Sequence, residues 1–443
     1  MTTPEKPIIA PQTTRRDFLK TSAAVVSAAA VSGCQTTLPL SQSAHVAGSD
    51  VLKVGMIGCG GRNAGAAVQA LKADPGTKLV AMCDMFLDRV HGKRESIKKE
   101  RPDQVDVPDS RCFEGFDSYK EVIACSDVVL VANAAKFHPL HLMAGIQAGK
   151  HVFVEKPHAI DPAGIKVLQA ACELAKQKNL SVLSGLQSRH HEGYIETIKR
   201  IHDGAIGKVV AIEENFLRGP YGLYPRKPGL TEVQYQCSNQ YHFTWLSGDD
   251  VPQSLVHNLD RATWVLHEEA PLKAHGLGGR STMTGEIYGN VFDHHSVVYE
   301  FASGVRIYAF CRTTTGCYDE SSSIILGNKG RASIIRCQIW GENAWRWEGT
   351  CDPYQIEHNK LFAGIRSGKP INCGDYMARS TLMGIMGQIS CYTGKEVTWE
   401  QLSKSDFYYA PRPEECRADM EPPVKLGPDG SYPVYKPGQT KLI

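Results

Sequence analysis

A glycine-rich turn between an apolar segment and a helical pattern is the feature that most constrains how this chain can fold. Residues 51–57 are mostly apolar and predict a buried strand, residues 58–61 read Gly-Cys-Gly-Gly, and residues 63–72 have helical periodicity. Gly58 permits the tight turn, and Gly60 lets the backbone approach a pyrophosphate at the helix N-terminus. The pattern predicts a dinucleotide-binding turn, with an ordinary strand–helix loop as the alternative.

Asp84 strengthens this prediction. It ends the next predicted strand, at residues 78–83, and follows Gly58 by 26 residues. A carboxylate at that place binds a ribose 2′-hydroxyl and repels a 2′-phosphate, so it favours NAD over NADP. The competing interpretation of Asp84 is a helix N-cap.

Strands and helices then alternate as far as Gly185, which predicts a parallel, doubly wound sheet. The further strands are expected at residues 128–132, 151–154 and 181–184, and the helices at 138–148 and 162–178. Beyond Gly185, adjacent antiparallel strands are expected at 295–301, 305–311, 322–326 and 332–335, after a strand that starts at 209–214 and before a helix at 378–392. The fold class is therefore α/β: an N-terminal Rossmann domain and a C-terminal α/β domain with an open, mainly antiparallel sheet.

The N-terminus predicts export. Arg15-Arg16, an uncharged apolar run at residues 23–31 and Gly33-Cys34 form a twin-arginine leader with a lipoprotein-type cleavage site. Nine residues are too few to span a bilayer. The alternatives are a disordered basic tail and an amphipathic helix. We expect lipidation at Cys34, although Val31 replaces the commoner Leu, and a periplasmic or membrane-anchored lipoprotein with no other membrane contact.

These patterns divide the chain into five parts. They are a signal at 1–34, a linker at 35–50, an NAD-binding Rossmann domain at 51–185, a substrate and oligomerisation domain at 186–402 and an irregular tail at 403–443. The tail is expected to wrap the body or to contact a neighbouring subunit.

Composition excludes some classes of function. The chain has 49 Lys and Arg against 47 Asp and Glu and no basic run, so nothing indicates nucleic-acid binding. The 14 cysteines show no CxxC pair and are interpreted mainly as small core residues. The pairs His190-His191 and His294-His295 lack a completing acid or cysteine, so no metal site is predicted.

Several motifs, in this order along the chain, resemble the glucose–fructose oxidoreductase/inositol dehydrogenase (Gfo/Idh/MocA) family. Besides the Gly58 turn and Asp84, they are Phe137-His138-Pro139, Ala148-Gly149-Lys150-His151-Val152, Glu155-Lys156-Pro157, Gly185 to His190, His257-Asn258-Leu259-Asp260 and Asn328-Lys329-Gly330. The resemblance implies hydride transfer between a sugar or polyol carbon and a nicotinamide, and an exposed sheet face that forms a homo-oligomer.

The resemblance also assigns roles to residues. Lys156 becomes an active-site residue, and its ammonium would stabilise negative charge on the substrate oxygen. His257 would accept the hydroxyl proton, and Asp260 would lie on the same helix face. The family carries Asp four residues before the histidine, where this chain has Gln253, and that departure puts the ordinary proton relay in doubt.

The predicted site residues fall into two further groups. Cofactor-binding residues are expected to be Gly58, Gly60, Gly61, Arg62, Asn63, Asp84, His138, Glu155 and Lys156. Substrate contacts are expected at Arg218, Tyr221, Tyr224, Arg226, Trp245 and Asp260, because aromatic faces stack on sugar rings and guanidinium groups bind hydroxyls or carboxylates. For the aromatic ones, packing in a surface loop is the alternative.

Three functions remain open on the sequence. The first is an exported NAD-dependent oxidoreductase that acts on a sugar, polyol or sugar derivative and recycles a tightly held cofactor. The second is a redox-neutral NAD-dependent glycoside hydrolase or epimerase of the same fold. The exported α-N-acetylgalactosaminidases of the family differ from this chain after the glutamate of Glu155-Lys156-Pro157, so Lys156 favours the first function while Gln253 mildly favours the second. The third is a non-catalytic sugar-binding lipoprotein, against which Lys156 and His257 argue.

Overall fold

The computed structural model describes residues 51–443. The predicted signal at 1–34, the linker at 35–50 and the lipidation at Cys34 lie outside the described residues. Of those that are described, no helix has the length and apolar character needed to cross a membrane.

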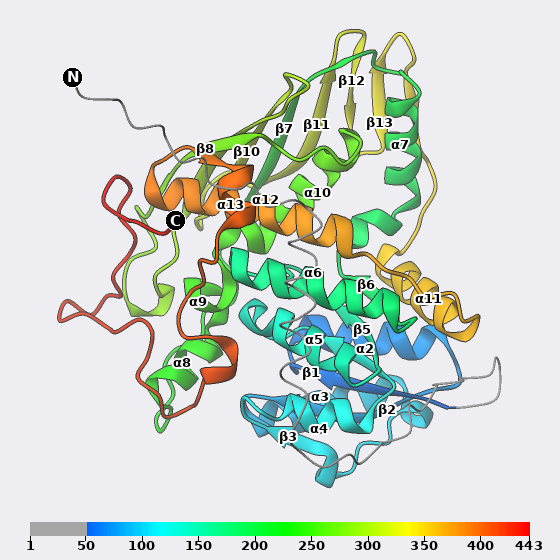
Figure 1. Ribbon diagram of the computed structural model, residues 1–443, viewed down its shortest axis with the longest axis vertical. Helices are drawn as coiled ribbons and strands as arrows, with labels where there is room; N and C mark the ends of the chain where they lie inside the picture. The colour runs from blue at the N-terminus through cyan, green and yellow to red at the C-terminus, as the bar shows by residue number, and fades with distance from the viewer. Residues whose placement is uncertain (1–50) are drawn as a thin grey trace, which may run out of the picture. The chain divides into compact units, whose positions relative to one another are not determined.

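The first third of the described chain, through Ser184, forms a six-stranded parallel sheet (Figure 1). The strand order is β3-β2-β1-β4-β5-β6, which is the doubly wound Rossmann order. The strands are β1 (Leu52–Ile57), β2 (Thr77–Asp84), β3 (Cys112–Glu114), β4 (Val128–Val131), β5 (His151–Val154) and β6 (Val182–Ser184). The helices that connect them are α2 (Gly61–Ala73), α3 (Leu87–Glu100), α4 (Tyr119–Cys125), α5 (His138–Gln147) and α6 (Pro162–Gln177). This confirms the predicted fold class for this part of the chain.

The rest of the described chain builds a nine-stranded, mainly antiparallel sheet, in the order β14-β13-β12-β11-β7-β10-β9-β8-β15. Its longer strands are β7 (Val209–Arg218), β8 (Lys273–Gly279), β9 (His294–Glu300), β10 (Arg306–Thr313) and β11 (Glu320–Gly327). Its shorter strands are β12 (Gly330–Ser333), β13 (Gln338–Gly341), β14 (Trp345–Arg346) and β15 (Val397–Thr398). The helices are α7 (Glu192–His202), α8 (Glu232–Ser238), α9 (Thr244–Ser247), α10 (Val256–Val265), α11 (Pro353–Arg366), α12 (Gly374–Thr393) and α13 (Trp399–Lys404).

One predicted pairing in this sheet is wrong. The segments at 305–311 and 322–326 were expected to be neighbours, but β7 lies between β10 and β11 and pairs with β10 in parallel. The long connection from β7 to β10 contains helices, which lets β7 return beside β10 in the same direction. This insertion places the C-terminal end of β7 next to the segment that precedes α10.

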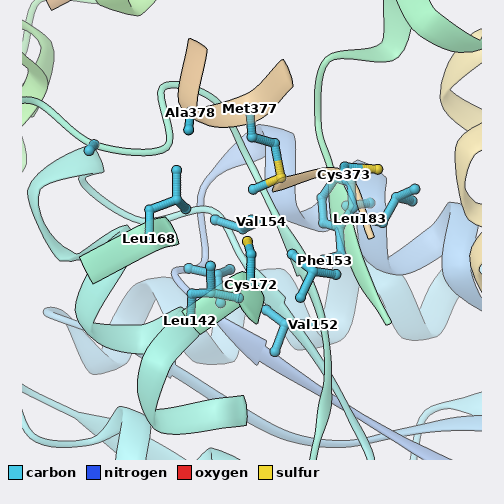
Figure 2. Packing of buried hydrophobic residues seen from close by; sticks show 14 of the residues in the cluster. Leu142, Val152, Phe153, Val154, Leu168, Cys172, Leu183, Cys373, Met377 and Ala378 are labelled. Atoms are coloured by element: carbon cyan, nitrogen blue, oxygen red, sulfur yellow. The ribbon is translucent and has the colours of Figure 1, made fainter. Parts of the chain in front are cut away.

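A shared core joins the parallel sheet to α12. Figure 2 shows β5 residues, including Phe153, gathered with Leu168 of α6 and with Met377 of α12. Buried His158 adds polar contacts, because its Nδ1 lies 2.9 Å from Thr381 Oγ1 and its Nε2 lies 2.9 Å from Ser184 Oγ. The backbone that follows Lys156 is therefore held on two sides.

The C-terminal tail packs on the body, as expected. The tail is mostly irregular, with a short 3₁₀ turn at Pro413–Glu415. The backbone of Tyr409 is held from two directions: Lys136 Nζ donates to its carbonyl at 2.6 Å, and its N–H donates to Asp161 Oδ2 at 3.1 Å. Tyr432 is buried and donates its hydroxyl to Glu232. Contact with a neighbouring subunit stays a prediction, as do the five domain boundaries.

Candidate active site

The glycine-rich turn has the geometry of a phosphate cradle. Gly58 has φ +90°, and a Cβ there would lie 2.8 Å from the backbone of Asn133, so only glycine suits this position. A Cβ on Gly60 or Gly61 would meet no described atom within 4 Å. No described side chain caps the N-terminus of α2, which leaves its first N–H groups for a ligand. The turn fits a pyrophosphate.

Asn63 explains the missing third glycine of the fingerprint. Its amide nitrogen donates to the carbonyls of Ile57, Gly58 and Leu130 at 2.9, 2.8 and 3.2 Å. The side chain is fully buried and ties α2 to β1 and β4. Asn63 was predicted to bind cofactor, but the structure places its side chain behind the turn, where it supports the loop.

A cleft beside the turn fits the adenosine half of a dinucleotide. Asp84 lies at its wall and accepts hydrogen bonds from the N–H groups of Cys59 at 2.7 Å and Phe86 at 3.2 Å. Burial raises the pKa of the Asp84 carboxyl above its ordinary value. The Arg89 guanidinium lies 4.0 Å from the carboxylate. The other lining residues include Gly58, Gly60, Phe116, Ser118, Tyr119, Asn133, Phe137, His141, Cys237 and Gln240.

A second cavity adjoins the first, because Ala132, Asn133 and Gln240 line both. Lys156 and His257 meet in this second cavity. It is also lined by Arg62, Ala135, His138, Glu155, Gly185, Tyr221, Tyr241, Leu246, Ser247, Gln253 and Tyr354. A dinucleotide that runs from the first cavity into the second would therefore end beside the two predicted catalytic groups.

Lys156 is held by a backbone carbonyl. Its Nζ donates to the carbonyl oxygen of Gln253 at 2.8 Å. Gln253 belongs to a π-helical turn, Val251–Leu255, directly before α10. Such wide turns often occur at functional sites. Gln253, which stands where the family carries Asp, therefore positions the Lys156 ammonium through its backbone carbonyl.

His257 is a neutral imidazole at the first turn of α10. Burial lowers its pKa well below the ordinary value, and the positive charges of Lys156 and Arg261 lower it further. Within the described chain, its Nδ1 is enclosed and has no hydrogen-bond partner. The side chain is half-buried at the cavity wall, so Nε2 is the ring nitrogen that can reach a substrate.

Glu155 connects the turn, the lysine and a distant helix. Its Oε1 accepts from Arg62 Nε at 2.5 Å, and its Oε2 accepts from the backbone N–H of Lys156 at 3.0 Å. Arg62 also donates from Nη2 to Glu357 of α11 at 3.0 Å. A Cβ on Gly185 would lie 2.6 Å from the Glu155 carboxyl carbon. This contact gives a physical reason for the glycine at position 185.

His138 holds the loop after β4 against the segment that follows Lys156. Its Nδ1 lies 2.7 Å from the Pro157 carbonyl, and its Nε2 lies 3.0 Å from the Asn133 carbonyl. Because Asn133 lines both cavities, His138 helps to shape the wall of the predicted cofactor site.

Of the six predicted substrate contacts, Tyr221 lines the second cavity. Its ring stacks on Tyr241 with centroids 4.2 Å apart, and its hydroxyl lies 2.9 Å from Ser254 Oγ. Arg218 lies behind it, where Nη2 donates to Asp250 at 2.6 Å and to Ser254 at 3.0 Å. Arg218 therefore supports the π-helical turn. Tyr224 is exposed, and it is not among the described cavity-lining residues.

The other three are not among the described residues that line the cavity, and their role as substrate contacts stays a prediction. Arg226 pairs with Glu232 and Glu286. Trp245 is buried and donates its indole N–H to Gln236 at 2.7 Å. Asp260 is fully buried and pairs with Arg189 at 2.7 Å. The guanidinium of Arg226, the indole N–H of Trp245 and the carboxylate of Asp260 are thus each bound to a protein partner, as buried polar groups usually are.

Several cavity residues were not predicted from the sequence, among them Gln240, Tyr241 and Tyr354. Gln240 and Tyr241 lie in a short 3₁₀ helix, Gln240–His242, that follows α8, and Tyr354 lies at the start of α11. Tyr354 stacks under the Arg62 guanidinium, 4.6 Å from its ring centroid. No short motif marks these residues, since they reach the cavity through tertiary packing.

One group among the described residues is spaced for a metal ion: His91, Asp109 and Cys112. Arg94 Nη1 donates to Asp109 at 2.5 Å and lies 3.5 Å from Cys112 Sγ. This guanidinium supplies the positive charge that a metal ion would bring, and the group lies outside both cavities' linings.

Comparison with known proteins agrees with this geometry. Residues 52–184 match the model of the Gfo/Idh/MocA oxidoreductase family with an NAD-binding Rossmann fold. Inositol 2-dehydrogenase of Salmonella typhimurium is 24% identical over 378 residues, 81% of this chain and 99% of that protein. Glycosyl hydrolase family 109 protein 1 of Bacteroides fragilis is 28% identical over 179 residues, 40% of this chain. The match spans 37% of that hydrolase's length.

Solved structures share the fold at low identity. Aldose-aldose oxidoreductase of Caulobacter crescentus, complexed with glycerol, has a TM-score of 0.60 and 18% identity, covering 78% of this chain and 99% of that one. Levoglucosan dehydrogenase with NADH and L-sorbose has a TM-score of 0.61 and 16% identity, covering 80% and 100%. These structures show the same fold, and the match to the family model at residues 52–184 supports the resemblance drawn from the motifs.

Proposed function

We propose that this protein is an NAD-dependent oxidoreductase that oxidises a hydroxyl-bearing carbon of a sugar, polyol or sugar derivative. The observation that carries the proposal is the meeting of Lys156 and a neutral His257 in one cavity. That cavity adjoins a cleft with the chemistry of a dinucleotide site. The inositol dehydrogenase and sugar oxidoreductase relatives support the same substrate class.

Lys156, His257 and Gln253 have different roles in the proposed oxidation of the alcohol. A bound nicotinamide dinucleotide supplies the hydride acceptor. Lys156 Nζ donates a hydrogen bond to the reacting oxygen and stabilises the negative charge that develops there. His257 Nε2 accepts the hydroxyl proton. Gln253 keeps the ammonium in place through its carbonyl oxygen, at 2.8 Å.

Asp84 supports NAD as the preferred cofactor. Its carboxylate lies in the adenosine cleft, where it would bind the ribose 2′-hydroxyl and repel a 2′-phosphate. Arg89 lies 4.0 Å away and reduces that repulsion without removing it. We expect NAD to bind more tightly than NADP.

We also propose that the protein is exported by the twin-arginine route, as a periplasmic or membrane-anchored lipoprotein, and forms a homo-oligomer. Twin-arginine export carries folded proteins, and outside the cytoplasm no free NAD pool is maintained. The cofactor would therefore have to remain tightly bound, and each turnover would have to restore it in place. A second substrate or return of the hydride to the first would do so.

The test is to purify the exported, mature protein without added cofactor and to record its absorbance at about 340 nm with candidate sugars and polyols. A rise that persists supports the dehydrogenase half-reaction. The matched control is Lys156→Met, which should retain the nicotinamide and lose the rise. A folded protein that never holds or binds a nicotinamide would refute the proposal.

A redox-neutral glycoside hydrolase is the second candidate. The match to the family 109 protein and the neutral side chain of Gln253 favour it. Hydrolysis of a chromogenic glycoside without lasting reduction of the cofactor would support this candidate over the first.

A further inference from the structure

The second cavity carries an excess of positive charge. Among the described residues that line it, Arg62 and Lys156 are cations and Glu155 is the single carboxylate. Its other polar lining consists of neutral side chains: Asn133, His138, Tyr221, Gln240, Tyr241, Ser247, Gln253, His257 and Tyr354. The formal charge of the lining is therefore positive by one unit.

Both oxygens of the single carboxylate already accept a hydrogen bond from the protein. One Glu155 oxygen accepts from Arg62 and the other accepts from the backbone of Lys156. The Glu155 side chain, which pairs with Arg62, is only 5% exposed to solvent. A neutral polyol that enters the cavity would find no free carboxylate to accept its hydroxyl protons.

The Lys156 ammonium, in contrast, has N–H groups that no protein acceptor occupies in the described structure. The Lys156 ammonium has three N–H groups, and the hydrogen bond to Gln253 uses one. The reacting oxygen of the substrate would accept a hydrogen bond from the second N–H group. An acceptor on the substrate can take the third.

Charged groups of both signs lie around the cavity, and Arg62 is also paired with the buried Glu357 at 3.0 Å. The pKa of His257 is lowered first by burial and then by the charges of Lys156, Arg261, His158 and Arg62. Arg261 is buried, donates from Nη1 to Ser188 Oγ at 3.2 Å, and its charge acts on the buried carboxyl of Glu214.

We propose that the substrate is a uronic acid, whose carboxylate binds beside Lys156 and Arg62. One excess positive charge matches a monoanionic carboxylate better than a phosphate monoester, which carries a charge near −2 at neutral pH. The stacked pair Tyr221 and Tyr241 offers an aromatic face for the carbohydrate ring. This inference rests on the proposed oxidoreductase function and names its substrate class.

The experiment compares each uronate with its uronamide, because the two have nearly the same shape and differ in charge. Gluco, galacto and manno pairs, together with the parent sugars and their 6-phosphates, are tested on the cofactor-loaded mature protein. Cofactor reduction gives kcat/KM, and calorimetry gives Kd. We expect at least one uronate to exceed its amide about tenfold in both measures, and the advantage to shrink between low salt and about 0.5 M salt.

Gln253→Glu provides the decisive variant, because it adds one negative charge to the lining. It should lower the uronate-to-uronamide ratio at least tenfold, whereas Gln253→Met, which adds no charge, should leave the ratio within about threefold of wild type. Equal or better use of uronamides, parent sugars or sugar phosphates would overturn the proposal, and so would a ratio that Gln253→Glu does not change. If no compound reduces the cofactor, the proposed function fails, while the calorimetric ratio still decides the charge preference.

Discussion

Gly185→Ala tests the packing that holds Glu155 in place. The new Cβ would lie 2.6 Å from the Glu155 carboxyl carbon and 2.7 and 2.8 Å from its oxygens. Ordinary contact begins at 3.4 Å, so the carboxylate must move by about 0.8 Å. That movement breaks or lengthens its hydrogen bonds from Arg62 and from the Lys156 backbone.

The cost follows from those two contacts. Hydrogen bonds to a charged group contribute about 1.5–3 kcal/mol each, and distortion forfeits part of each one. Replacing glycine by alanine offsets about 0.4–1 kcal/mol by restricting the unfolded chain. We expect the free energy of unfolding to fall by about 2 kcal/mol, and kcat to fall because the Lys156 backbone shifts.

The assay is a urea or thermal unfolding curve beside that of Gly92→Ala. Gly92 lies in the exposed surface of α3, and a Cβ there meets no described atom within 4 Å. This control should gain about 0.5–1 kcal/mol, because alanine favours a helix over glycine. If Gly185→Ala is as stable as wild type, the Glu155 contacts do not stabilise the site as argued.

Four further predictions concern the catalytic groups and the buried charges. Lys156→Met should lower kcat about 10²–10³-fold with little change in Kd for NAD, as expected for loss of one group that stabilises an oxyanion; a kcat within tenfold of wild type would contradict its role. The pKa of His257 is lowered by burial, so the acid limb of kcat/KM should lie well below pH 6.5, and a limb at or above 6.5 would show that this imidazole is not the base. Burial lowers the pKa of His358 to about 3 in the folded protein. In the unfolded chain, the same imidazole becomes protonated below a pH of about 6.5. Stability should therefore fall as pH drops below 6.5, and His358→Phe should remove about 1.4 kcal/mol per pH unit of that slope in denaturation curves. Asp260→Ala leaves the Arg189 guanidinium partly unpaired and should cost about 3–5 kcal/mol while KM of the folded fraction is unchanged; a raised KM would support Asp260 as a substrate contact.

The parallel half of the fold was predictable because its signals are local. The sequence predicted the bounds of several of its strands and helices to within one residue, as for the buried strand Val128–Val131 and the amphipathic helix Pro162–Gln177. The place of β7 between β10 and β11 was not predictable, because strand order in a sheet depends on long-range contacts that periodicity does not carry.

The candidate site divides in the same way. Lys156, His257 and Asp84 stand next to strong local motifs, and the structure places them at the two cavities. Trp245 was chosen for its residue type and Asp260 for its place in the motif that begins at His257, and the structure shows them bonded to Gln236 and Arg189. Tyr354 reaches the cavity because α11 packs against α2, a contact between segments nearly 300 residues apart.

The hydrogen bond between Lys156 and the Gln253 carbonyl changes the meaning of the missing carboxylate. A carboxylate at position 253 would orient the ammonium and cancel its charge, whereas the carbonyl orients it at 2.8 Å and leaves the charge in place. The uncancelled charge lowers the pKa of His257, which makes the imidazole a weaker base. It also stabilises an alkoxide on the substrate, which makes the hydroxyl a stronger acid. The two effects act on the same proton transfer in opposite directions, so Gln253→Asp should raise the pH of the acid limb while lowering the maximal rate.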